Sequence, residues 1–237
     1  MEITLFSVWH FMYIILIIGG SILGAVMINK KDENAKQKLL SVLAISVTVV
    51  YILDFFLMPL VREDHLIDID KLPFHFCTVL AIFVPFVQFN KRFEKIKDVV
   101  ACFAIVSCLM YITYPGSALG GVDVFSYRVV QTFLYHGVLF AWGFISVATG
   151  AVTLSFNKIW KELVGLVILV AWGLIGSYTY SAITPHHYDW FFVTGSTYPF
   201  IPSVLMPFVV IFAVFGMCAI IHLIDLGVKK IIQKKQQ

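Results

Sequence analysis

Polar and ionisable side chains lie inside or beside several long apolar segments of this sequence. An ionisable group at the middle of a lipid-embedded helix costs about 2.5–3.5 kcal/mol, so such a position indicates a function. At about 1.5 Å per helical residue, Asp54 lies about 10 Å deep and His136 about 13 Å deep from the same side. The residues predicted to share one site near that side are His10, Asp54, His75, Cys77, Arg128, Gln131 and His136.

Helical periodicity groups some of these residues on common faces. At about 100° per residue, Arg128, Gln131 and His136 fall on one side of the segment 127–150, which is therefore predicted to be polar. His75 and Cys77 are about 200° apart if their segment is helical throughout. His75 is therefore a poor candidate base for Cys77.

Each residue also has a structural interpretation. A cysteine in an apolar helix is most often a small buried hydrophobe, and this is the favoured interpretation of Cys77 taken alone. Asp54 and Arg128 can pair with each other across helices. His136 is the strongest single candidate, because it is titratable, deep in its segment and flanked by polar groups.

The composition identifies lipid as the solvent of the elements that carry these residues. Apolar residues make up 60% of the chain, charged residues only 13%, and the mean hydropathy is +0.91. In soluble domains, roughly a quarter of all residues are charged. The net charge of +3 is spread over separate loops, so nucleic-acid binding is not predicted.

The apolar runs are continuous and each is about 20 residues long, which predicts α-helices rather than the alternating strands of a barrel. The fold class is therefore all-α: a polytopic bundle of seven transmembrane helices. The first run has no cation before it, so a retained span is expected and not a signal peptide. The predicted spans are 7–28, 39–61, 73–90, 98–115, 127–150, 162–180 and 203–226.

The cations predict the direction of these helices. Fourteen of the 17 Lys and Arg residues lie in alternate breaks, at 30–38, 91–97, 158–161 and beyond 228. The positive-inside rule then places the N-terminus outside and the C-terminus in the cytoplasm, as expected for a multi-pass protein of the cell membrane. Residues 1–228 are predicted to form one seven-helix domain, and 229–237 a basic cytoplasmic tail.

The longest outer connection, 181–202, is aromatic and contains Pro and Gly, so it is expected to lie as a cap in the membrane interface. His186, His187 and Asp189 within it are either metal ligands or interfacial residues, and the role of this loop stays open. The four cysteines all lie in apolar spans without a Cys-x-x-Cys spacing, so neither a disulfide framework nor a zinc site is predicted. No metal or cofactor is predicted.

Three segments carry a family resemblance: FSVWHF at 6–11, KLPFHFCTVLAIFVPF at 71–86 and FSYRVVQTFLYHGVLF at 125–140. They resemble the YwaF family of bacterial integral membrane proteins, to which animal transmembrane protein 164 is related. The resemblance covers most of the chain, and LPFHFC is its most specific part. It carries over His10, Cys77 and His136, in the same order and on corresponding spans.

The resemblance implies chemistry on lipids. The animal relative is a phospholipid acyltransferase with a Cys nucleophile, which implies Cys77 as the nucleophile and His136 as its base. In such a reaction a thioester intermediate passes the acyl chain to an alcohol or to water. Arg128 would bind a lipid phosphate through its planar guanidinium, and His10 would orient a carbonyl or a head group.

Two other classes of function compete with a lipid-modifying enzyme. A polar pocket lined by Asp54, Arg128, Gln131 and His136 suits a non-catalytic transporter, or a substrate-binding subunit, for a small amphiphile or lipid. In a structural or assembly factor, the same groups would serve helix packing alone. Membrane lipids and a lipid or amphiphilic substrate are the expected partners, and the sequence does not indicate an oligomeric state.

Overall fold

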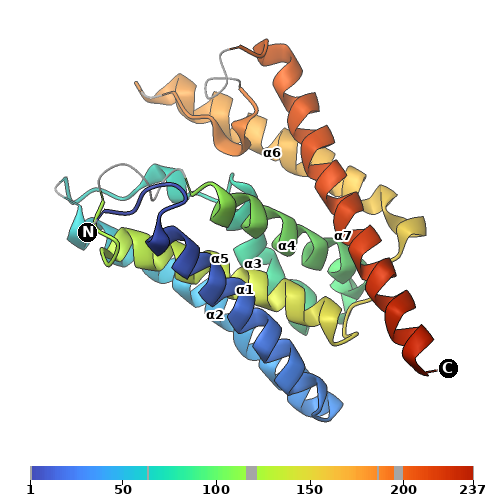
Figure 1. Ribbon diagram of the computed structural model, residues 1–237. Helices are drawn as coiled ribbons and strands as arrows, with labels where there is room; N and C mark the ends of the chain where they lie inside the picture. Colours follow the sequence, from blue (N-terminus) through green and yellow to red (C-terminus); the bar gives the residue numbers. More distant parts are fainter. Residues whose placement is uncertain (1, 63, 116–121, 186, 195–199, 237) are drawn as a thin grey trace. The chain divides into compact units, whose positions relative to one another are not determined.

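The computed structural model describes the chain except for residues 1, 63, 116–121, 186, 195–199 and 237. The described residues confirm the all-helical class, and each helix corresponds to one predicted span (Figure 1). The helices are α1 (Val8–Asn29), α2 (Glu33–Val61), α3 (Phe76–Phe89), α4 (Lys97–Thr113), α5 (Tyr127–Ala148), α6 (Trp160–Ile183) and α7 (Met206–Gln236).

Six of these helices are long and apolar enough to cross a membrane. The exception is α3, whose 14 residues span about 21 Å at 1.5 Å per residue, less than the roughly 30 Å of a hydrocarbon core. The fold is thus that of a helical membrane protein with six to seven apolar helices. The outward N-terminus and the cytoplasmic C-terminus stay predictions.

Side-chain caps define where several helices begin. Ser7, Asp32 and Ser126 precede α1, α2 and α5, and each side chain accepts a hydrogen bond from the backbone N–H three residues later. Such a cap satisfies one of the N–H groups that a helix leaves free at its start. The start of α5 at Tyr127 therefore agrees with the predicted span.

The chain divides into two compact units, which are described separately. The first comprises residues 1–69 and 77–153, and the second comprises 70–76 and 154–237. The prediction of one domain over 1–228 stays a prediction.

In the first unit, α5 is the central helix and packs against α1, α2 and α4 (Figure 1). About two thirds of the apolar window of α5 is buried, against 17% for α1. The contact between α5 and α4 is close, because a Cβ at Gly143 would lie 2.8 Å from the carbonyl oxygen of Ala101. Functional side chains on α4 and α5 are therefore held in the interior of this unit.

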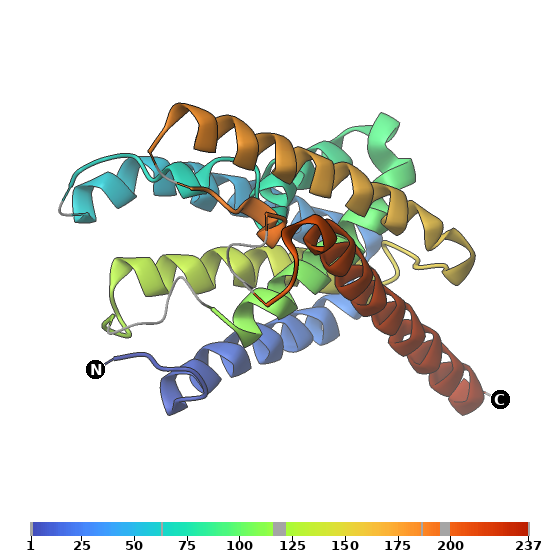
Figure 2. The same cartoon turned by 90° about the horizontal axis from the view of Figure 1, so that it is seen from above.

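In the second unit, α6 and α7 cross at an angle (Figure 2). The segment before α3 joins them through Phe74, whose ring lies 5.0 Å from that of Trp172 and 4.9 Å from that of Trp190. The Trp172 indole N–H donates to the carbonyl of Pro73 at 2.7 Å. These contacts explain why α3 begins at Phe76, later than the predicted span.

Candidate functional site

Cys77 lies in the first turn of α3, and three side chains from α4 and α5 lie near its thiol. These are the imidazole of His136, the thiol of Cys108 and the hydroxyl of Ser107. Cys77 is partly exposed, whereas Cys108 is fully buried, and both are free thiols. The structure therefore brings together the thiol and the imidazole that the sequence singled out. The term thiol site is used below for Cys77, Cys108 and His136.

The hydrogen bonds of His136 define its tautomer. Its Nδ1 lies 2.8 Å from the carbonyl oxygen of Thr132, one turn earlier in α5. Because a carbonyl oxygen only accepts, Nδ1 carries a proton and donates it, and in the neutral ring the lone pair belongs to Nε2. The side chain is buried, with 7% of its surface exposed. A neutral His136 therefore keeps one basic nitrogen for a partner other than the backbone.

Two tyrosines fix the plane of the His136 ring. The ring of Tyr111 on α4 is stacked on it, with centroids 3.7 Å apart and an interplanar angle of 3°. Tyr135 meets it edge to face, at 4.7 Å and 80°. Together with the Thr132 bond, these contacts hold the imidazole in one orientation, as a positioned base requires.

A hydrogen bond from α2 holds α3, the helix that carries Cys77. Pro85 has no N–H, so it cannot bond the carbonyl of Ala81 one turn earlier. The Thr48 hydroxyl on α2 donates to that carbonyl at 2.5 Å. In lipid an unsatisfied carbonyl costs several kcal/mol, so this bond both permits the proline and ties α3 to α2.

The C-terminal end of α3 is tied to α5. The Trp142 indole N–H donates to the Gln88 side-chain oxygen at 3.3 Å, and Trp142 is fully buried. Gln88 also donates to Gln37 of α2 at 3.2 Å. A helix held at both its middle and its end gives the Cys77 thiol a defined position.

Asp54 is buried on α2 and belongs to the same unit as the thiol site. Its Oδ1 accepts a hydrogen bond from the Tyr127 hydroxyl at 3.0 Å. Gln131 is also buried, and its side-chain oxygen accepts from the Thr132 hydroxyl at 3.4 Å. Both predicted binding residues therefore face protein interior.

His10 is fully buried, and both of its ring nitrogens are engaged by backbone groups. The Phe6 N–H donates to Nδ1 at 3.0 Å, so the proton lies on Nε2, which donates to the carbonyl of Ile112 at 2.7 Å. Ile112 belongs to the buried cluster of Ile3, Val124, Val129 and Phe133. The observed bonds of His10 connect α1 to α4, and its predicted role toward a head group stays a prediction.

Two arginines near the predicted outer side differ in their partners. Arg62 pairs with Asp64 at 2.6 Å and with Asp68 at 3.5 Å, and its hydrogen bond lowers the pKa of Asp64 to about 2. Arg128 is exposed, and it forms no ion pair with any residue that the structure describes. The alternative in which Arg128 pairs with Asp54 is not observed among these residues, whereas binding of an external anion stays a prediction.

His75 lies in the second unit, whereas Cys77 lies in the first. Its Nδ1 accepts from the N–H of Phe191 at 3.4 Å. In the outer connection, His187 lies 3.4 Å from the Thr194 hydroxyl, and Asp189 accepts from the Thr194 N–H at 2.7 Å. His186 lies outside the described residues. The observed bonds of His75, His187 and Asp189 thus organise this connection.

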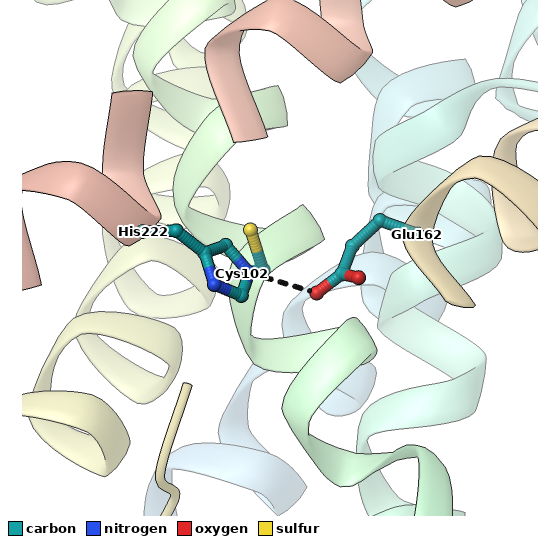
Figure 3. A group of neighbouring side chains, drawn as sticks. All are labelled: Cys102, Glu162 and His222. Atoms are coloured by element: carbon teal, nitrogen blue, oxygen red, sulfur yellow. Dashed lines mark hydrogen bonds and ion pairs between the residues drawn. The ribbon is translucent and has the colours of Figure 1, made fainter. Parts of the chain in front are cut away.

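The second unit contains a buried contact between a histidine and a carboxylate that the sequence interpretation missed. His222 Nε2 on α7 lies 3.0 Å from Glu162 Oε1 on α6, and both side chains are 2% exposed (Figure 3). Glu162 begins a predicted span, and a carboxylate there was a sequence signal for such a pair. Their facing atoms are ligand types that zinc accepts.

The sequence interpretation also missed residues in and around the thiol site. Cys108 and Ser107 on α4 fall within an apolar span of the sequence. Neither they nor Tyr111, one turn later, are among the predicted site residues. Ser107 and Cys108 lie four and three residues before Tyr111, and this spacing was a signal, because it places each of them beside Tyr111 on α4. Nothing in the sequence indicated that this face meets α3.

Comparison with known proteins gives one family. The sequence model of the TMEM164 family matches residues 5–225. The search of curated proteins and the search of solved structures found no match. The match includes all three segments on which the resemblance rested, and it confirms the relation to transmembrane protein 164. The narrower YwaF assignment stays a prediction.

Proposed function

The chain belongs to the TMEM164 family of membrane proteins, and on that premise we propose that it is an intramembrane enzyme that transfers or hydrolyses acyl groups of lipids. Cys77 is the nucleophile and His136 the general base. The observation that carries this proposal is the proximity of the Cys77 thiol to an imidazole whose Nδ1–H is bound to the Thr132 carbonyl.

The first step is attack of Cys77 on an ester. His136 Nε2 takes the thiol proton while the sulfur attacks the carbonyl carbon. The carbonyl electron pair moves to oxygen and gives a tetrahedral intermediate. When this collapses, the C–O bond breaks, and the imidazolium returns its proton to the departing alkoxide. The product is a thioester on Cys77.

The second step removes the acyl group. An alcohol gives its proton to His136 and attacks the thioester carbonyl, which forms a new ester and releases the thiol. Water in place of the alcohol gives hydrolysis. The position of Cys77 in the first turn of α3 supports this chemistry, because the N–H groups at a helix start favour negative charge on a nearby atom.

The surrounding residues fit a lipid substrate. The exposed Arg128 guanidinium would bind the lipid phosphate, and Asp54 and Gln131 would contribute to the polar end of the site. The exposed apolar side chains of α1 and α2 suit contact with acyl chains. The site would open to the outer leaflet of the cell membrane.

A thioester trap tests the proposal. The protein in phosphatidylcholine vesicles is incubated with a phospholipid that carries a fluorescent acyl chain. The reaction is then quenched with acid. We expect fluorescence on the Cys77 peptide that neutral hydroxylamine removes. Cys77→Ala should lose this label. Cys218→Ala, which replaces a buried cysteine of α7, should keep it.

A label that persists in Cys77→Ala would contradict the assignment of the nucleophile. If the wild-type protein binds the lipid and forms no thioester, the enzyme proposal fails. A non-catalytic carrier or substrate-binding subunit for an amphiphile would then be favoured.

A further inference from the structure

Tyr135 carries a buried hydroxyl that the proposed acyl transfer does not yet use. The residue is 5% exposed, and its hydroxyl has no hydrogen-bond partner among the residues that the structure describes. A buried polar atom without a partner is unfavourable, because it has lost its hydrogen bonds to water. Such an atom calls for a specific explanation, and a catalytic role is one of them.

The position of Tyr135 relates this hydroxyl to the thiol site. Tyr135 precedes the base His136 on α5, and its ring meets the imidazole edge to face. The electrostatic neighbours of the hydroxyl include the thiols of Cys77 and Cys108, together with Tyr51 and Asp54. Its surroundings therefore contain the sulfur at which an acyl group would be attached.

The neighbouring polar groups have other partners. His136 Nδ1 is held by the Thr132 carbonyl, and the Ser107 hydroxyl lies 3.5 Å from the carbonyl oxygen of Ala104. Tyr111 lies flat against the imidazole, which suits orientation of the ring. Tyr135 is the O–H donor near the sulfur that stays without an acceptor among the described residues.

Attack of a thiolate on an ester creates a new acceptor. The carbonyl oxygen becomes negatively charged in the tetrahedral intermediate, and fixed donors aimed at that oxygen lower the barrier. We propose that the Tyr135 hydroxyl is a catalytic residue that donates a hydrogen bond to this oxyanion. The assignment rests on the proposed acyl transfer at Cys77.

The proton balance of the step is unchanged. The Cys77 proton goes to His136, the S–C bond forms, and the carbonyl electron pair moves to oxygen. Tyr135 keeps its proton throughout and only shares it. On collapse the electron pair returns, the C–O bond breaks, and the hydroxyl is again without an acceptor. The interaction is thus strongest in the transition state, which is the condition for catalysis.

Tyr135→Phe removes the hydroxyl and keeps the ring. We compare two reactions of Cys77 in the reconstituted protein: acylation by p-nitrophenyl butyrate, and thiolation by methyl methanethiosulfonate. Of the two reactions, only acylation passes through a tetrahedral intermediate with a negatively charged carbonyl oxygen. Tyr135→Phe should slow acylation about 10²–10³-fold, the usual effect of losing one oxyanion donor, and leave thiolation unchanged.

Two variants provide controls. Tyr13→Phe also removes a hydroxyl, which donates to the Val124 carbonyl at 2.9 Å and not toward Cys77. This variant should leave both rates unchanged. His136→Ala should slow both reactions, because a base activates the thiol toward any electrophile. The two tyrosine variants and the histidine variant thus give three distinct patterns.

The outcomes separate the two proposals. Equal acylation rates in the wild type and Tyr135→Phe would overturn the oxyanion role and leave the acyl transfer intact. A parallel loss of acylation and thiolation in Tyr135→Phe would also overturn it, since the hydroxyl would then act on the thiol or on packing. If wild-type Cys77 is thiolated and never acylated, the proposed function itself fails.

Discussion

His10 and His136 are both buried histidines of the first unit, and they differ in which groups occupy their ring nitrogens. At His10, a backbone N–H and a backbone carbonyl take both nitrogens and connect α1 to α4. At His136, the backbone takes only Nδ1, and the imidazole also lies near the Cys77 thiol. Burial alone therefore does not identify a functional histidine. The number of nitrogens that the backbone leaves free is more informative.

The largest expected effect concerns Cys77. Cys77→Ala should abolish turnover, and Cys77→Ser should be nearly as inactive, because a hydroxyl stays protonated where a thiol can ionise. The measurement is acyl release from a fluorescent phospholipid in vesicles. If Cys77 only fills space, Cys77→Ala would cost about 1 kcal/mol of packing and keep its activity.

The two histidines should respond in opposite ways. His136→Ala should slow acylation of Cys77 roughly 10²–10⁴-fold, as loss of a general base does, with the fold retained. His10→Ala leaves the buried Ile112 carbonyl and the Phe6 N–H without their partner, which costs about 1–3 kcal/mol per group. It should lower the thermal midpoint and leave the acylation rate of folded molecules close to wild type. Acylation lost equally in both variants would break the comparison.

The combination of Cys77 and His136 variants sharpens the result. Groups that act as a unit fail together, so the double variant Cys77→Ser with His136→Ala should be little worse than Cys77→Ser alone. Turnover numbers of the four proteins measure this. Multiplicative losses would mean that the two side chains act independently.

Thr48 should affect the site indirectly. Thr48→Val removes the hydroxyl that satisfies the Ala81 carbonyl at nearly constant shape, and should destabilise the protein by about 1–3 kcal/mol. Thr48→Ser keeps the donor and should be close to wild type. Thermal midpoints in one detergent compare the three proteins. If Thr48→Val is as stable as the wild type, the link between α2 and α3 is unimportant.

Arg128→Lys should have the smallest effect. It keeps the charge and loses the planar fork that binds phosphate through two hydrogen bonds. KM for a phospholipid should rise several-fold, and KM for p-nitrophenyl butyrate, which has no phosphate, should not change. If the variant has the wild-type KM for the phospholipid as well as for p-nitrophenyl butyrate, Arg128 is only a charge at the membrane boundary.

Periodicity and hydrophobicity were enough to predict the seven helices, whereas the pairing of Cys77 with His136 was implied by the family resemblance. They could not predict that α3 starts at Phe76, because this depends on contacts of Phe74 with Trp172 and Trp190, about 100 residues away. The pairing of Cys77 with Cys108 was hidden for the same reason. Both cysteines lie in apolar runs, and only the folded structure shows that their thiols lie near each other.

Chemical rescue of His136→Ala by imidazole tests the central claim most directly. In this variant the ring of Tyr111, which is stacked on His136 in the wild type, would form one wall of the space that the missing side chain leaves. A free imidazole ring could stack on Tyr111 in the same place. We expect added imidazole to restore Cys77 acylation at least about tenfold, with a saturable dependence, and to leave His10→Ala unchanged. A His136→Ala protein that acylates Cys77 at the wild-type rate without imidazole would contradict the account.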